Sequence, residues 1–485
     1  MPFQKSVPVV GIVGGGFTGA TVALHLANTF GKRKPPKIVV FEPRERLGAG
    51  LAYDTAEPVH RINVPAGRMS AYPDDPESFT RWLEKTDALV DDPEAFSADG
   101  TPFPRRAIFG RYVAAQLAPL LSSGIVEHRR TTVSEIARDA GRWIVQPQDG
   151  QTTEVDILVV AVSHPSPSLP RSLRAIASHP KLIGDATRPD ALAPIEPSDR
   201  VLVVGNGLTA ADVIAALRRR GHRGAITAIS RRGLRSRGHS KSVQDPFGDF
   251  LDHPSPTASH LLHRVRQQIA AAVRAGFTWH AVLDTVRSQA QTIWAGLPVA
   301  ERRRIVRHLR PFWDVHRFRI APQVEHALDE AVEDGSLSIL AASVLSAKQG
   351  DDGFHLLLRK RHATEPMPLV VDAVVVTTGP GHGSILQSQP FLSGLAENGL
   401  LTLCPTGLGI LNDRTARAVT AQGEHLETLF IAGPLARGTV GELMGLPQVT
   451  EHAVLVAQQV ADILSAGPTG DPVKPAAFKK QAALP

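Results

Sequence analysis

The chain has 485 residues, of which 42% are hydrophobic, 5% aromatic and 21% charged, and its formal net charge is +6. The small basic excess and the few aromatic residues argue against nucleic-acid binding, and no apolar run reaches the roughly 18–20 residues that a membrane helix needs. The single cysteine, Cys404, excludes an intramolecular disulfide and a Cys-x-x-Cys redox pair. A strand begins close to the amino terminus, so we expect no signal peptide and a cytoplasmic protein.

Short apolar runs alternate with helical patterns along the chain, which predicts an α/β fold with parallel sheets. The first unit reads strand 7–13, helix 17–30 and strand 37–42. A second unit repeats this order with strand 201–204, helix 208–219 and strand 225–230. Two further apolar runs, 155–161 and 371–377, also resemble each other. The duplication predicts two Rossmann-like dinucleotide-binding domains.

The first glycine motif, Gly14-x-Gly16-x-x-Gly19, lies between a predicted strand and a predicted helix. Glycine permits the tight turn, and the helix N-terminus then presents free N–H groups to a pyrophosphate. Glu42 ends the next strand, where a carboxylate accepts hydrogen bonds from ribose hydroxyls. We assign this site to FAD; the alternative is a purely structural turn.

The second motif contains Gly205 and Gly207, with Ala211 in place of the third glycine. The following strand ends in Arg231 and Arg232, and guanidinium groups at that position suit a 2′-phosphate. This favours NADPH, although the two arginines could equally be solvated charges or stack on adenine. We therefore predict an NAD(P)H site.

These motifs suggest four segments. We expect the first part of the FAD-binding domain at 1–190, the NAD(P)-binding domain at 199–370, a return to the FAD-binding domain at 371–465, and a flexible tail at 466–485. An Arg- and Ala-rich helical insertion is expected at about 254–325. Five of its arginines suggest a solvated helix face, namely Arg302, Arg303, Arg304, Arg307 and Arg310.

Several segments resemble bacterial FAD/NAD(P)-binding proteins related to N-hydroxylating and class B flavin monooxygenases. They are LGAGLAY at 47–53, HRINVPAGRMSAYPDDP at 60–76, GHRGAITAISRRG at 221–233 and HRFRIAP at 316–322. The resemblance implies further FAD contacts around Gly379, Gly433 and Pro447. It also implies a monooxygenase that uses FAD, NAD(P)H and O2, with the cofactors carrying the redox chemistry. Where many such proteins have Gly-Asp, this chain has Gly433-Pro434.

The substrate implied first by the resemblance is urate, which would place the protein in purine degradation. Asn63, Arg68 and Met69 would then approach the flavin, with Arg68 facing the anionic substrate, although the same residues could simply fold a rigid loop. His316, Arg317 and Arg319 could bind an anion, or form a helix-end salt-bridge cluster. We take Arg68, Asn63 and His316 as candidate catalytic residues and Met69 as a flavin contact. No histidine spacing indicates a metal site.

Three alternatives to urate hydroxylation remain open. The first is an N-hydroxylase of an amino acid or amine, the second a flavin-dependent reductase, and the third an FAD-bound redox scaffold. The expected partners are a small-molecule substrate and O2, with no nucleic acid and no membrane; self-association into a homo-oligomer is left open.

Overall fold

The computed structural model describes residues 7–31 and 33–466, so the tail expected at 466–485 lies outside the described residues except for Ala466. Its first sheet runs β15-β16-β7-β1-β2-β3 and is parallel except for β15. Its strands are β1 (Val9–Val13), β2 (Lys37–Phe41), β3 (Val126–Arg129), β7 (Ile157–Val160), β15 (Arg417–Val419) and β16 (His425–Ile431). The central strands are nearly continuous apolar runs because helices and a small sheet cover them.

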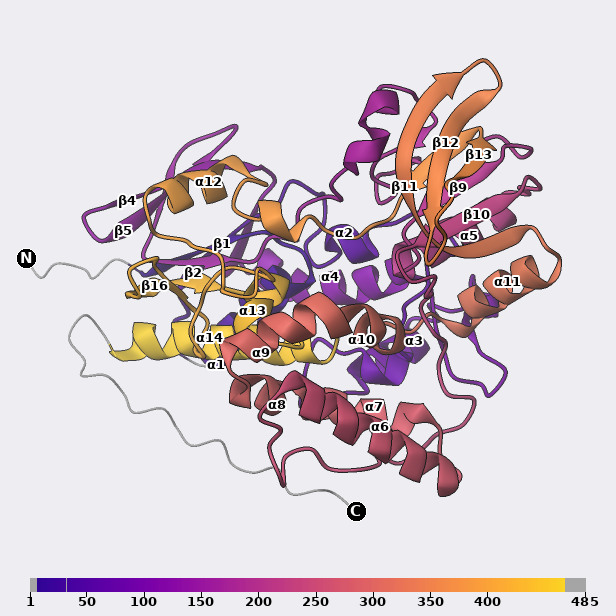
Figure 1. Cartoon of the computed structure of the whole chain (residues 1–485). Helices are drawn as coiled ribbons and strands as arrows, with labels where there is room; N and C mark the ends of the chain where they lie inside the picture. Colours follow the sequence, from indigo (N-terminus) through magenta and orange to yellow (C-terminus); the bar gives the residue numbers. More distant parts are fainter. Residues whose placement is uncertain (1–6, 32, 467–485) are drawn as a thin grey trace, which may run out of the picture.

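Helices from both ends of the chain pack beside this sheet. The long ones are α1 (Phe17–Thr29), α4 (Arg106–Ser122) and α14 (Gln448–Ala466), and α14 lies along α1 (Figure 1). A three-stranded sheet, β4 (Val133–Asp139), β5 (Arg142–Pro147) and β6 (Thr153–Val155), packs against α12 (Pro390–Glu397). Shorter elements are α2 (Gly50–Tyr53), η1 (Ala66–Arg68), α3 (Ser78–Lys85), η2 (Pro93–Ala95), η5 (His382–Ser384), η6 (Gly433–Ala436) and α13 (Arg437–Val440).

The second sheet runs β13-β12-β11-β10-β9-β14-β8; β12 is antiparallel to both of its neighbours, β11 and β13, and all the other neighbouring strands pair in parallel. Its strands are β8 (Leu182–Ile183), β9 (Val201–Val204), β10 (Ile226–Ser230), β11 (Leu337–Gly350), β12 (Gly353–Lys360), β13 (Met367–Val371) and β14 (Ala373–Val376). Helices α5 (Leu208–Arg219) and α11 (Pro322–Glu333) pack against each other, and η3 (Arg171–Ile176) packs on β11.

A helical segment separates β10 from α11 and occupies the lower part of Figure 1. It comprises α6 (Ala258–Arg274), α7 (Trp279–Ser288), α8 (Ala290–Gly296), α9 (Val299–Arg304), the π-helical η4 (Ile305–Leu309) and α10 (Arg310–Arg317). Its own small core includes Phe250 and Val282, while Trp294 packs with Cys404 of the first unit. The segment therefore contacts both units.

The expected two-domain α/β architecture is confirmed. The two similar apolar runs occupy equivalent places, since β7 lies beside β1 and β14 beside β9. Because β14 still belongs to the second sheet, the chain returns to the first unit only after residue 376, later than the expected boundary at 371. The two connections between the units pass each other at an isolated bridge between Pro167 and Pro380. Across residues 7–31 and 33–466, no helix has the length and apolar character required to cross a bilayer.

Candidate functional site

The first glycine turn leaves no room for a side chain at Gly14 or Gly19. Gly14 has φ +98°, and a Cβ there would lie 2.7 Å from the carbonyl oxygen of Ala161. A Cβ on Gly19 would overlap the carbonyl oxygen of Gly14, so only glycine allows α1 to pack this close to the turn. Gly16 is the N-cap of α1 and supplies no side-chain cap, which leaves the first N–H groups of the helix free for a ligand.

Glu42 is fixed at the edge of this turn. Its Oε2 accepts a hydrogen bond from the Gly15 N–H at 2.9 Å, and its Oε1 accepts bonds from the backbone N and Nη1 of Arg44 at 3.1 and 3.0 Å. The side chain is nearly buried but lines the adjacent cavity. A carboxylate has about four acceptor sites, so lone pairs remain for ribose hydroxyls.

A cavity of about 1170 Å³ opens in front of the first turn. Its lining includes Gly14, Gly16 and Glu42 from the first unit, Asp212 from α5, and Leu446 before α14. Ordinary small-molecule sites hold about 300–1,000 Å³, so this cavity has room for a dinucleotide. The free helix N-terminus, the glycine turn and the carboxylate together fit FAD.

The carboxyl-terminal part of the chain closes this cavity. Gly433 has φ +70° and lies against the Thr18 hydroxyl, and its N–H donates to Nδ1 of His452 at 3.3 Å. Pro434, Leu446 and Val449 line the cavity, and Pro447 directly precedes α14. The N-terminus of α14 therefore lies at the cavity, where its dipole favours negative charge.

The second glycine turn repeats the first. Gly205 has φ +117°, its N–H donates to Ile229 O at 2.8 Å, and a Cβ would overlap the carbonyl oxygen of Thr377. The equivalent bond in the first turn runs from Gly14 N to Phe41 O at 2.9 Å. Ala211 is buried at the third position of the motif.

Gly207 is the N-cap of α5, and an added Cβ would meet no atom within 4 Å. The turn is therefore open in front of the helix N-terminus, as a second nucleotide requires.

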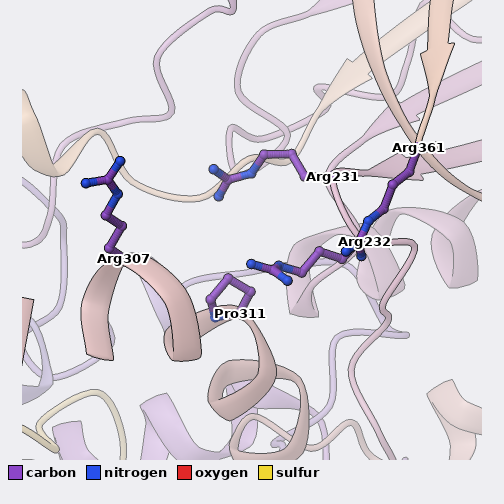
Figure 2. Close-up of a pocket in the computed structure, with 5 residues that line it drawn as sticks. All are labelled: Arg231, Arg232, Arg307, Pro311 and Arg361. Atoms are coloured by element: carbon purple, nitrogen blue, oxygen red, sulfur yellow. The ribbon is translucent and has the colours of Figure 1, made fainter. Parts of the chain in front are cut away.

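An arginine pocket of about 230 Å³ lies beyond the end of β10. Its lining is Arg231, Arg232, Arg307, Pro311 and Arg361. Figure 2 shows Arg231 and Arg232 extending towards the helical turns that carry Arg307 and Pro311. Within residues 7–31 and 33–466, none of the four guanidinium groups forms an ion pair with a carboxylate, and that of Arg232 stacks over Phe312 at 4.6 Å from the ring centroid. Four unpaired guanidinium groups make a site for a multiply charged anion such as a phosphate.

Only part of the expected solvated arginine face is solvated. Arg303, Arg304 and Arg307 are exposed, but Arg302 is half-buried, bonds the carbonyl oxygens of Leu297 and Ala295, and stacks over the Trp294 ring. Arg310 is also half-buried and donates to His382.

A buried polar wall separates the large cavity from the helical segment. His164 lines the cavity, neither of its ring nitrogens has a hydrogen-bond partner, and its ring meets that of His382 edge-on at 4.9 Å. Burial, reinforced by Arg437 and Arg310, lowers the pKa of His164 to about 4. Burial and Arg310 lower the pKa of His382 to about 3. Both imidazoles are therefore neutral near pH 7.

The structure places the four substrate-side candidates away from the cavity lining. Asn63 is half-buried and its carbonyl oxygen faces His239 Nε2 at 3.0 Å, while Arg68 is exposed. Met69 is buried in the main hydrophobic core. His316 is half-buried, bonds its own helix at Phe312 O at 2.7 Å, and meets the Trp279 ring edge-on. The roles expected for these residues remain predictions.

Gly379, an expected cofactor contact, has φ +80° and lies in the connection after β14, also outside the cavity lining. Within residues 7–31 and 33–466, no group of three or more His, Cys, Asp or Glu side chains is arranged to hold a metal ion.

Comparisons with known proteins agree with this geometry. Residues 11–165 match the family model described as FAD-NAD(P)-binding. No curated protein matches the sequence. The chain thus carries an FAD-NAD(P)-binding domain, which confirms FAD and NAD(P) as its expected cofactors.

Solved structures share the fold over almost the whole chain. The reduced ornithine hydroxylase of Pseudomonas aeruginosa is 16% identical, with a TM-score of 0.65 over 94% of this chain and 99% of that one. The ornithine N-hydroxylase of Kutzneria sp. 744, with reduced FAD, NADP+ and L-ornithine, is 18% identical, with a TM-score of 0.60 over 95% and 99%. The FAD-bound cadaverine monooxygenase of Erwinia amylovora is 14% identical, with a TM-score of 0.62 over 99% and 100%.

Proposed function

We propose that the protein is an FAD-dependent monooxygenase that uses NADPH and O2 to hydroxylate the nitrogen of a small amine or amino acid. The balanced reaction converts R–NH2, O2, NADPH and H+ into R–NHOH, NADP+ and water. FAD, when bound, supplies the oxygen chemistry, and the protein binds, orients and shields the reactants. At the low identities observed, the choice of reaction is an analogy with proteins of the same fold.

The observation that carries this proposal is the pairing of two open dinucleotide cradles in one chain with a single cysteine. Two cradles suit electron transfer from a nicotinamide nucleotide to a flavin. Without a cysteine pair, the chain has no dithiol to pass those electrons to a disulfide. An external acceptor such as O2 is then the simplest destination, and the solved structures with this fold include amine hydroxylases.

Urate hydroxylation, the substrate first expected, finds no support. The proteins of similar fold act on ornithine and cadaverine, which fit the amine alternative better. Arg68, the residue expected to face urate, does not line the cavity.

The arginine pocket supports NADPH over NADH. It follows β10 directly, where a Rossmann-like domain receives the adenine ribose, and its guanidinium groups lack carboxylate partners among the described residues. An unpaired arginine is a strong ligand for a dianionic phosphate because its donors match the phosphate oxygens in pairs.

The test is turnover by the purified, FAD-loaded protein with NADPH under 18O2 and a panel containing ornithine, lysine, cadaverine, aspartate and urate. We expect amine-stimulated NADPH oxidation and a product heavier by one 18O atom on nitrogen. Rapid NADPH oxidation with an artificial acceptor and no labelled product from any amine would instead indicate a reductase. FAD binding with negligible NADPH oxidation would indicate a redox scaffold.

A further inference from the structure

Behind the wall of the large cavity lies a cluster of charged side chains with more arginines than acids. Its members come from α7, α10, α13 and the residues around them: Asp284, Arg287, Arg310, Asp314, Arg317, Arg319, Arg437 and Glu442. Five arginines therefore face three carboxylates.

Three of the arginines have close carboxylate partners. Arg319 forms a two-point pair with Asp284 at 2.7 and 3.1 Å, and Arg317 Nη2 lies 3.0 Å from Glu442 Oε1. Arg310 Nε bonds Asp314 Oδ2 at 3.1 Å. This is the salt-bridge cluster foreseen as an alternative for Arg317 and Arg319.

The other two arginines lack such a partner among the described residues. Arg437 is 3% exposed, and its nearest carboxylate is Asp314, already paired, at 3.8 Å. Arg287 donates only to neutral acceptors, the carbonyl oxygen of Leu446 at 2.6 Å and Gln448 Oε1 at 3.0 Å. Glu451, one turn into α14, is exposed and bonds neither.

The excess of arginines over carboxylates affects both the pKa values and the hydrogen bonding of the cluster. Burial, followed by the charge of Arg317, lowers the pKa of Arg287 to about 9. Nitrogen atoms of Arg287, Arg317 and Arg437 are buried without hydrogen-bond partners. A buried, uncompensated charge costs several kcal/mol, and a bound anion would offset that cost.

The cluster lies directly behind the part of the cavity wall that Gly445 and Leu446 form. Arg287 binds the carbonyl oxygen of Leu446, and Arg317 Nη2 lies 3.8 Å from the position that a Cβ on Gly445 would occupy. Both Gly445 and Leu446 line the cavity. His164, which lines it as well, lies within the electrostatic reach of Arg437.

We propose that Arg287, Arg317 and Arg437 form a carboxylate-binding subsite beside the flavin cavity, and that the substrate is a small amine bearing carboxylate groups. This inference rests on the proposed function. The two unmatched positive charges favour an amino dicarboxylate over a monocarboxylate, and either over a diamine. Held there by its carboxylates, the substrate directs its nitrogen into the cavity.

The experiment measures binding to the oxidised, FAD-loaded protein through changes in flavin absorbance, using L-aspartate, L-ornithine, cadaverine and succinate. Succinate carries no nitrogen, so it reports the subsite without any turnover. We expect the tightest binding for aspartate and succinate and the weakest for cadaverine. Arg437→Met and Arg287→Met should each weaken succinate binding roughly tenfold to a hundredfold, as expected for a lost charge-assisted hydrogen bond.

Arg302→Met is the matched control, because it removes a half-buried arginine that lies outside the cluster and has no carboxylate partner among the described residues. Its succinate binding should equal that of the unmodified protein. Arg437→Lys keeps the charge and should bind with intermediate affinity. If Arg437→Met does not fold, Arg287→Met carries the test alone.

Two results would overturn the subsite. One is unchanged succinate binding in folded variants. The other is a shift only in the flavin reduction potential, which would assign the cluster to the charge of reduced flavin. Failure of the proposed function can be distinguished from failure of the subsite. In that case succinate would still bind in a way that depends on Arg437, but no amine would give a hydroxylated product. Hydroxylation of cadaverine alone would retain the function and remove the subsite.

Discussion

Arg106 and Asp212 join the two dinucleotide-binding units through a two-point ion pair, with Nη1–Oδ2 at 2.8 Å and Nη2–Oδ1 at 3.0 Å. Arg106 begins α4 and Asp212 lies in the second turn of α5. Both line the large cavity, and Arg106 Nε also bonds the carbonyl oxygen of Arg61 at 2.7 Å. The pair thus fixes the wall of the flavin cavity to the helix of the second nucleotide turn.

Breaking this pair should loosen the contact between the units. We expect Arg106→Met, Asp212→Asn and their combination, analysed as a double-mutant cycle of urea unfolding, to give a coupling free energy of about 1.5–3 kcal/mol. The exposed pair between Arg219 and Glu94 is the control, and its coupling should stay below about 1 kcal/mol. Equal couplings for the two pairs would contradict the structural role of Arg106.

Two glycine-to-alanine substitutions should have separable effects. Gly19→Ala forces a methyl group onto the Gly14 carbonyl oxygen, so we expect lower stability and loss of bound FAD. Gly207→Ala meets no atom and has an ordinary φ of −95°, so the protein should fold with its full FAD content. Its methyl group faces the open turn, and the KM for NADPH should rise on the order of tenfold, or about 1.4 kcal/mol. FAD absorbance and steady-state kinetics measure both. Retention of FAD by Gly19→Ala would refute the first-site assignment.

The arginine pocket should decide between nicotinamide nucleotides. Arg231→Ala and Arg232→Ala should each raise the KM for NADPH about tenfold or more while leaving that for NADH nearly unchanged, because only NADPH carries the 2′-phosphate. Arg304→Ala, an exposed arginine of the neighbouring helix that pairs with Glu301, should change neither value. Parallel increases for both nucleotides would show that the pocket binds a part that they share.

Buried histidines should make the fold sensitive to mild acid. His452 is buried, and burial lowers its pKa to about 4. The unfolded chain, with a histidine pKa near 6.5, binds this proton first as the pH falls. The stability that His452 contributes is therefore complete above about pH 6.5 and declines towards pH 4, by up to about 1.4 kcal/mol per pH unit.

His452→Asn tests this prediction, since its amide oxygen can still accept the Gly433 N–H bond. Urea unfolding between pH 4 and 7 should show a flatter pH dependence in this variant than in the unmodified protein. His326→Asn, at an exposed position in α11, should leave the slope unchanged. An unaltered slope in His452→Asn would mean that the pKa of this histidine is the same in the native and unfolded states, which would contradict the effect of burial.

The sequence predicted those parts of the site that local chemistry determines. Both glycine turns and the acid at Glu42 could be read because strand, turn and helix follow one another within about 30 residues. The sequence predicts only two of the four arginines of the arginine pocket. Arg231 and Arg232 directly follow β10, whereas Arg307 and Arg361 reach the pocket from η4 and from the end of β12.

The charged cluster was beyond sequence reasoning as a whole. The cluster includes Arg287, Arg317 and Arg437, which are spread over some 150 residues of the sequence. Only the packing of the helical segment against the loop before α14 brings them together. The sequence singles out Arg317 as a possible anion ligand. The excess of arginines over carboxylates around it depends on which side chains are buried together, and no local pattern encodes that. Arg68 and His316 belong to recognisable segments but do not line the cavity, so the roles expected for them stay predictions.

The bridge between Pro167 and Pro380 marks where the second unit is inserted into the first. As the chain leaves the ribosome, β1, β2, β3 and β7 emerge early, but β16 and α14 follow only after some 260 further residues. The sheet of β9, β10 and β14 can therefore form while α1 still lacks its partner α14. The FAD cradle can then be completed only after the second unit has emerged, so flavin binding follows the folding of the nicotinamide-nucleotide unit.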